Sequence, residues 1–265
     1  MTLVPIQDFI DPNADSEAIA GLPFVHTQTI KKVKTKYQDT LRPYEKCEIF
    51  DEWLTYLYYG VPLYSPRAEG VTSEWLPVCF LLKPDKIRIF KVYPMDTGAF
   101  HGQPEGRGDE MTAFFEELNL PPKEAVKLYE LSCDCENIRR YVIQFFGDNK
   151  SYFDGKCKDV IETSPDAPPK DNPVLQCLHR MLMAHLERLD DRCKLVEVLT
   201  KGCYRLNDVL QMVIWPNEQL SEFRALGYDF GALPIEYDSS CAFDQASFIE
   251  MIYQAAKVYL NIEAA

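Results

Sequence analysis

The sequence has no long apolar run and no export signal. Nowhere in its 265 residues do about 18 apolar residues follow one another, so no segment is predicted to span a membrane. The first residues, MTLVP, carry no basic cluster and are followed by Asp8 and Asp11, so no signal peptide is expected. We therefore expect a cytoplasmic protein that has no membrane partner.

Positive charge is also scarce. The chain has 28 lysines and arginines against 41 aspartates and glutamates, a formal net charge of −13. Because nucleic-acid binding requires many cations that meet phosphates, a nucleic-acid partner is less expected than a protein or a small molecule. The one dense basic segment is KKVKTK at 31–36. It is interpreted either as a solvated face or as a segment that meets phosphates.

Sequence motifs for metal and phosphate binding are missing. Neither G-x-G-x-x-G nor a P-loop occurs. The nine cysteines are scattered, and the closest pair, Cys133 and Cys135, is spaced C-x-C instead of the C-x₂₋₄-C of zinc sites. We therefore predict no metal site, and thiols that serve as small apolar groups in a reducing compartment.

What the chain does have is an ordinary globular composition, 46% hydrophobic and 26% charged, with a mixed pattern of elements. Short apolar, β-branched and aromatic runs predict strands at 22–27, 78–82, 87–93, 193–199 and 209–215. The turn signal KPDK at 83–86 joins the second and third of these runs into a predicted hairpin.

Capping residues and helical spacing predict the helices. Asp109, Asp134 and Asn217 are the expected N-caps, Gly227 an expected helix end, and SFIE at 247–250 a capping box. Predicted helices lie at 109–118, from 122 onward, at 135–146, 174–189, 217–226 and 247–260. The sequence thus predicts a single α+β domain over 1–265. We expect a mixed, mainly antiparallel sheet, a helical insert at about 109–189 and a C-terminal helix.

Three segments stand out as candidates for a functional site. His26 lies in the apolar run FVHT, the block 56–67 reads YLYYGVPLYSPR, and Glu197 lies in the apolar run KLVEVL. Each has a structural interpretation. His26 would be a satisfied strand histidine, the tyrosines would belong to the core, and Glu197 would face solvent on an alternating strand.

In this order, the three segments resemble the ADP-ribosyltransferase superfamily, most closely its bacterial toxin-type members, including those that modify DNA bases. In these proteins a histidine strand is followed by an aromatic segment ending in Pro-Arg and later by a strand reading Glu-Val-Leu. Pro66-Arg67 and Glu197-Val198-Leu199 are similar to those pieces. The resemblance covers roughly half the chain and has no counterpart for the helical insert.

The resemblance implies an NAD-consuming transferase, a bacterial toxin or an anti-phage (antiviral defense) effector. Glu197, His26 and Arg67 would be catalytic. Glu197 would stabilise the oxocarbenium-like state formed when nicotinamide leaves. The residues that bind NAD would be His26, Thr27, Tyr59, Tyr64 and Arg67.

Within this set, His26 would bond a ribose hydroxyl, the tyrosine rings would stack on nicotinamide, and Arg67 would pair with the pyrophosphate. These side chains are expected to share one cleft with Glu197. Leu195 stands where arginine-modifying members carry an acid, which argues against an arginine acceptor. The expected acceptor is a protein or a small molecule, and a neutralising partner protein is a further expectation.

Two other functions stay open. The chain would be a non-catalytic interaction or regulatory protein if its aromatic surface binds another chain. It would be a metal-dependent nuclease if Glu197 and Lys201, behind Asp190 and Asp191, form an acidic metal site. Nuclease cores of that type place the acid and the lysine two residues apart on one side of a strand, where this chain has Leu199.

Overall fold

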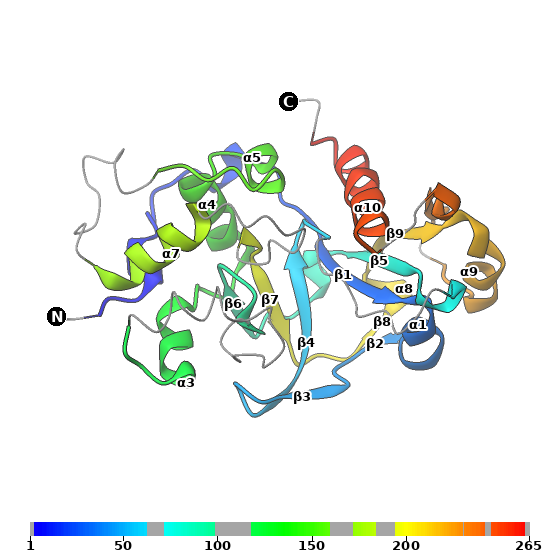
Figure 1. Cartoon of the computed structure of the whole chain (residues 1–265), viewed down its shortest axis with the longest axis horizontal. Coiled ribbons are helices and arrows are strands. Elements are labelled where there is room, and N and C mark those ends of the chain that lie inside the picture. The colour runs from blue at the N-terminus through cyan, green and yellow to red at the C-terminus, as the bar shows by residue number, and fades with distance from the viewer. Residues whose placement is uncertain are drawn as a thin grey trace. The chain divides into compact units, whose positions relative to one another are not determined.

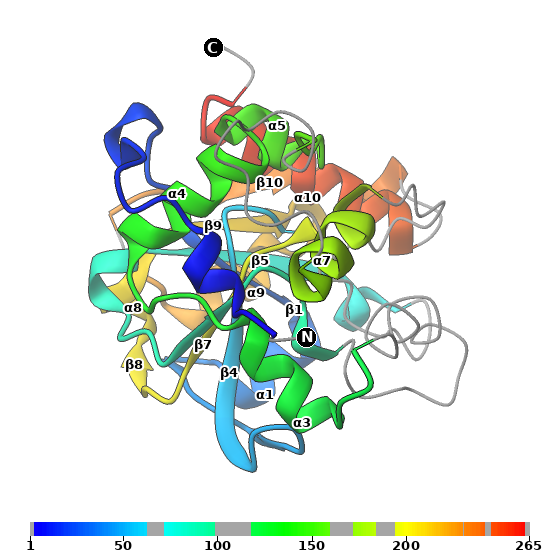
Figure 2. The same cartoon turned by 90° about the vertical axis from the view of Figure 1, so that its left-hand side faces the viewer.

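A computed structural model of the chain describes residues 3–62, 72–98, 118–159, 172–183, 194–229, 231–241 and 245–262. Two compact units are built from alternating segments of the chain (Figures 1 and 2). Unit 1 consists of Met1–Gly21, Cys47–Glu52 and Ile89–Glu197, and unit 2 of Leu22–Lys46, Trp53–Arg88 and Val198–Ala265. The expected single domain with an insert at about 109–189 stays a prediction, and each unit is described by itself.

Unit 2 is built on a mixed sheet whose strands run in the order β10-β9-β5-β1-β4-β7. Strand β1 is antiparallel to both β4 and β5, β5 is antiparallel to β9, and β10 is parallel to β9. The α+β class with a mainly antiparallel sheet is therefore confirmed. The bounds are β1 (Phe24–Thr29), β4 (Glu52–Tyr59), β5 (Pro77–Leu82), β7 (Glu197–Thr200), β9 (Leu210–Pro216) and β10 (Ile235–Tyr237).

Smaller elements complete unit 2. Strand β3 (Glu45–Cys47) pairs with β4, and β2 (Thr40–Leu41) pairs with β8 (Tyr204–Arg205) in a separate two-stranded sheet. The helices are α1 (Ile30–Lys36), α8 (Leu206–Val209), α9 (Leu220–Leu226) and α10 (Gln245–Tyr259). Single 3₁₀ turns are η3 (Ser73–Trp75), η4 (Pro84–Lys86), η8 (Asn217–Gln219) and η9 (Ser239–Cys241).

Both faces of the central strands are covered. Helix α10 lies against one face beside β5 and β9 (Figure 1), where Val25, Cys79 and Ile252 share a buried cluster. Aromatic rings cover the opposite face, since Phe80 meets Tyr228 with ring centroids 6.0 Å apart. Burial on both faces explains why all six residues of β1 and all six of β5 are buried, without apolar–polar alternation.

Unit 1 contains the helices of the middle of the chain. They are α3 (Pro122–Ala125), η6 (Val126–Tyr129), α4 (Cys135–Phe145), α5 (Asn149–Phe153) and α7 (Pro173–Met183), with the short strand β6 (Lys91–Tyr93). The predicted cap of α4 is confirmed, because the Asp134 carboxylate accepts from the Asn137 amide. The 3₁₀ turns η1 (Ile6–Phe9) and η2 (Ser16–Ala18) belong to the N-terminal segment, which runs alongside α4 (Figure 2).

Several predicted elements were wrong in detail. The expected hairpin does not form, because β5 is flanked by β1 and β9, and the strand after the turn is only β6. Asn217 caps no helix. Helix α9 begins three residues later, and the Asn217 side chain instead accepts from the amide and hydroxyl of Ser239.

Boundaries account for the remaining differences. Helix α10 begins at Gln245, two residues before the predicted capping box at Ser247. Strand β7 (Glu197–Thr200) covers only the last three residues of the predicted 193–199 run and extends one residue beyond it. The predicted helix at 109–118 lies outside the described residues apart from Leu118, and the predicted 174–189 helix is described to Met183 as α7.

Candidate functional site

Glu197 opens β7 and its side chain has no exposed surface. Its Oε2 accepts two hydrogen bonds from one residue, from the Thr97 hydroxyl at 2.6 Å and from the Thr97 amide at 3.2 Å. The interpretation of Glu197 as a solvent-facing strand residue was therefore wrong. Burying a carboxylate is costly unless donors satisfy it, and these two bonds offset part of that cost.

A tight turn holds Thr97 in place. The chain leaves β6 through Pro94, and the Asp96 carboxylate accepts from the Gly98 amide at 2.7 Å, which closes an Asx-type turn around Thr97. A Cβ at Gly98 would lie 2.8 Å from Asp96 Oδ1, so a larger residue there would displace the carboxylate that closes the turn. The segment Asp-Thr-Gly after a strand was a readable turn signal that the sequence analysis missed.

Tyr93 adds an aromatic and hydrogen-bonding neighbour from β6. Its hydroxyl donates to Glu130 Oε2 at 3.2 Å, and Lys91 forms an ion pair with the same carboxylate. Burial, and then the negative charges of Glu130 and Glu197, raise the pKa of Tyr93 above its usual value, so the phenol stays protonated. The Phe50 ring stacks on Tyr93 with centroids 5.5 Å apart.

This Glu197 cluster, defined as Glu197, Thr97, Tyr93, Glu130 and Lys91, lies within unit 1. Chemically it offers an oriented carboxylate, and a neutral phenol whose hydrogen is already donated to Glu130. A fixed negative charge of this kind stabilises a developing positive charge best where water is excluded.

His26 lies in unit 2, on β1. Its Nδ1 is 2.9 Å from the carbonyl oxygen of Tyr56. Because that carbonyl can only accept, Nδ1 carries the hydrogen and Nε2 carries a lone pair, which is buried with no hydrogen-bond partner. Burial, with a further contribution from the Lys32 charge, lowers the pKa of His26 to about 4. His26 is therefore a neutral imidazole that can accept one further hydrogen bond.

Thr27 and Tyr59 are differently placed. Thr27 pairs with Cys79 in the register of β1 and β5, and so lies on the face covered by α10, opposite to that of its neighbour His26. Tyr59 is 1% exposed, and its hydroxyl accepts from the Leu22 amide at 3.0 Å. The contacts of Tyr59 thus support its structural interpretation as a core tyrosine.

The predicted common cleft stays a prediction. Tyr64 and Arg67 lie outside the described residues, and His26 and Glu197 belong to different units. The structure therefore brings Glu197 into contact with Thr97, and the Glu197 charge acts on the Tyr93 phenol. Of these three residues only Glu197 was predicted from sequence.

Metal chemistry has no candidate centre in the described part of the chain. Over those residues, no three His, Cys, Asp or Glu side chains group so that they could hold an ion. Asp190 and Asp191, named for the nuclease alternative, lie outside them. The Cys133 thiol donates to the Phe90 carbonyl at 3.2 Å, and partial burial and the Glu130 charge raise its pKa, so the thiol stays protonated.

Comparisons with known proteins add no assignment. The chain matches no protein-family model, and neither the curated proteins nor the solved structures gave a significant match. Among the helices in the described ranges, none is both long and apolar enough to cross a membrane.

Proposed function

We propose that this protein is an NAD-consuming, ADP-ribosyltransferase-like enzyme in which Glu197 is the catalytic carboxylate. The observation that carries the proposal is the fully buried Glu197, whose Oε2 accepts from both donors of Thr97. A carboxylate held in this way stabilises the positive charge that develops on a ribose when its nicotinamide leaves.

In the proposed reaction the bond between ribose C1′ and the nicotinamide nitrogen breaks, and nicotinamide departs with the bonding electron pair. A nucleophile on the acceptor then bonds to C1′, and its proton passes to Glu197 or to water. NAD is thus a substrate, and no step passes through a metal. His26 supports this assignment because its Nε2 has a free lone pair that can accept a hydrogen bond from a hydroxyl group. Arg67 would pair with the pyrophosphate, and Tyr64 would stack on nicotinamide.

For the acceptor, we propose a protein or a small molecule. The lysines of α1 support this choice because they already have internal contacts. Lys34 pairs with Glu222 at 3.0 Å, and the Lys31 ammonium lies 4.7 Å from the centre of the Trp75 ring. The basic run is thereby partly neutralised within unit 2, which favours its interpretation as a surface face over a phosphate-contacting segment. A toxin or anti-phage effector in the cytoplasm, with a neutralising partner protein, completes the proposal.

The test is release of nicotinamide from NAD by the purified full chain, followed by chromatography. Glu197→Gln should lower the release at least a hundredfold, because it removes the charge while its amide oxygen still accepts from Thr97. The matched control is Glu236→Gln, the same change at an exposed position of β10, which should leave release unchanged. Full release by Glu197→Gln would end the assignment.

A non-catalytic interaction protein is the second candidate, and Trp53 favours it. This tryptophan on β4 is 56% exposed, and tryptophan is enriched among residues that dominate binding between proteins. Trp53→Ala should then abolish capture of a partner while leaving the free energy of unfolding within about 0.5 kcal/mol. Partner capture by Trp53→Ala equal to that by the wild type would count against the interaction-protein function. Turnover that requires added Mg²⁺ or Mn²⁺ would instead favour the nuclease alternative.

A further inference from the structure

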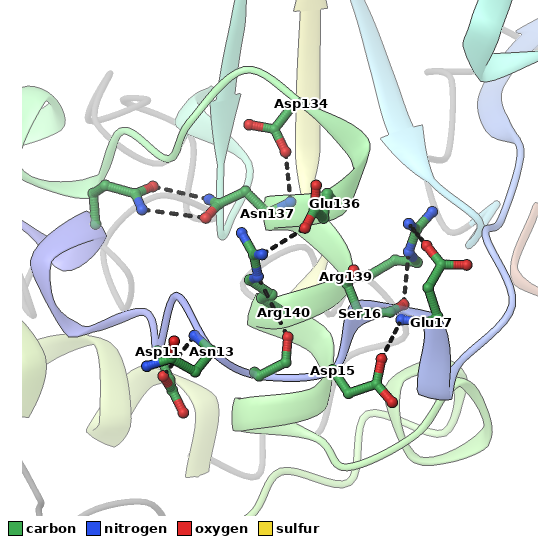
Figure 3. Close-up of polar contacts among 12 residues, drawn as sticks. Asp11, Asn13, Asp15, Ser16, Glu17, Asp134, Glu136, Asn137, Arg139 and Arg140 are labelled. Carbon is green, nitrogen blue, oxygen red and sulfur yellow. Dashed lines mark hydrogen bonds and ion pairs between the residues drawn. The ribbon is translucent and has the colours of Figure 1, made fainter.

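The N-terminal strap, defined as residues 3–20, belongs to unit 1, where polar side chains of α4 (Figure 3) and the first residue of α5 bind it. Its apolar anchors are Ile6 and Ile10, which are both buried. Much of the remaining strap surface is exposed, and short 3₁₀ turns are its only regular structure. The strap therefore lies on unit 1 as an extended peptide would lie on a receptor.

Glutamine and asparagine side chains bind the strap backbone. Gln144 does so with both ends of its amide, donating to the Phe9 carbonyl at 2.7 Å and accepting from the Asp11 amide at 3.0 Å. Asn149, the first residue of α5, donates to the Ala20 carbonyl at 2.8 Å. These contacts recognise an extended backbone in the way that a neighbouring strand would.

Two arginines on α4 bind the second half of the strap (Figure 3). Arg139 donates to the Ser16 carbonyl at 2.8 Å and pairs with the Glu17 carboxylate at 2.7 Å. Arg140 donates to the Ala14 carbonyl at 3.4 Å. Arg139 thus combines backbone recognition with a charge preference, whereas the Arg140 guanidinium also pairs with Glu136 of its own helix.

One side chain of the strap is recognised specifically. Gln7 exchanges two hydrogen bonds with Asn137, at 2.8 and 3.2 Å, and its Oε1 also accepts from the Ser132 amide at 2.6 Å. Asn137 is only 4% exposed, so loss of Gln7 would leave a buried amide without these partners.

The charge of the strap complements the arginines. It contains no lysine or arginine, and its acidic residues are Asp8, Asp11, Asp15 and Glu17. We propose that α4 and the start of α5 form a peptide-binding site whose ligand is this strap. The strap binds as a separable segment, so that the same acidic, extended sequence binds when supplied as a free peptide. This inference does not rest on the proposed enzymatic activity.

The test uses the full chain with a protease site inserted between Ala20 and Gly21. After folding and cleavage, the cut strap should co-elute with the rest of the protein in gel filtration. A fluorescent peptide of residues 1–20 should then exchange with it, as followed by anisotropy. A cut strap that elutes alone, with no binding of the peptide, would overturn the proposal.

Variants of the peptide distinguish specific from non-specific binding without altering the folded protein. Gln7→Ala in the peptide should weaken binding roughly tenfold to a hundredfold, because it leaves Asn137 and the Ser132 amide unsatisfied. Asn13→Ala, at an exposed position, should change affinity less than about twofold. Equal affinity of the two variants would overturn the proposal.

A second pair of variants tests the protein side. Gln144→Ala should weaken peptide binding roughly fivefold to tenfold, since two backbone contacts are lost. The control is Gln254→Ala, an exposed glutamine on α10 in unit 2, which should leave binding unchanged. Equal binding by these two proteins would place the strap elsewhere and overturn the proposal.

Discussion

The hydroxyl oxygen of Thr97 lies 2.6 Å from Oε2 of Glu197, and the amide nitrogen of Thr97 lies 3.2 Å from the same oxygen. A single residue thus supplies two donors to a carboxylate that has no exposed surface. The two partners are 100 residues apart in the chain, so their pairing depends wholly on the tertiary fold. Glu197 is therefore positioned by a turn that cannot be predicted from the residues next to Glu197.

The first prediction concerns this contact. Thr97→Val keeps the shape of the side chain but removes the hydroxyl donor, so it should lower the free energy of unfolding by about 1–3 kcal/mol. Thr97→Ser keeps the donor and should cost only about 1 kcal/mol for the lost methyl group. Urea denaturation monitored by circular dichroism measures both effects.

The control for this prediction is Thr72→Val. Thr72 is exposed, and its side chain makes no capping bond to η3. The free energy of unfolding of this variant should lie within about 0.5 kcal/mol of that of the wild type. A Thr97→Val variant as stable as Thr72→Val would show that the bond to Glu197 contributes nothing to stability.

The second prediction concerns acid sensitivity. The pKa of His26 is about 4 in the folded chain, because burial disfavours the charged ring, whereas an unfolded histidine titrates near 6.5. Between these values the unfolded chain binds more protons, so stability contributed by His26 is complete above about pH 6.5 and falls as the pH drops toward 4. The total loss amounts to about 3 kcal/mol.

Two measurements check this acid effect. The His26 imidazole signals in an NMR titration should keep their neutral positions down to about pH 4. In urea denaturation, replacing His26 with glutamine should flatten the pH dependence between 6.5 and 4, whatever it does to absolute stability. A ring that titrates near 6.5 in the folded protein would contradict the prediction.

The third prediction compares two glycines with left-handed backbone. Gly60 has φ +72°, and a Cβ there would lie 2.5 Å from Leu22 Cδ1. Gly227, which ends α9, has φ +67° but open space around its missing Cβ. Alanine at either position should cost about 1–2 kcal/mol of backbone strain.

At Gly60 the clash with Leu22 adds to that strain. Overpacking costs about 1–3 kcal/mol, so Gly60→Ala should be the more destabilising change by at least about 1 kcal/mol. Thermal and urea denaturation of the two variants provide the comparison. Equal losses at both positions would mean that Leu22 moves aside without cost.

Elements with local signals were predictable from the sequence. The Asp134 cap, the buried stripe of α4 and the left-handed Gly227 each depend on neighbours within a few residues. The strands β1 and β9 also lie close to their predicted positions, since their apolar runs end at recognisable boundaries. These features are set by spacing and by individual residues, which a single sequence contains.

Features that depend on distant partners were not predictable in this way. The two apolar runs at 78–82 and 87–93 looked like a hairpin, but β5 pairs with β1 and β9, which come from far earlier and far later in the chain. The contact of Thr97 with Glu197 was missed for the same reason, although the Asp-Thr-Gly turn that holds Thr97 has a local signal. Glu197 was picked out, but its burial and its donor are set by contacts that local patterning does not encode.

The alternation of the two units along the chain has a consequence for folding during synthesis. The strap is made before α4, and Asn137, which binds Gln7, follows Gln7 by 130 residues. At about 5–20 residues per second, that interval lasts roughly 7–26 s. Formation of the unit 2 sheet is delayed as well, because β1 and β5 are synthesised long before β9. Neither unit can complete its fold until its late segments have been synthesised. During that time the acidic strap and the edges of the early strands of the nascent chain lack their native partners.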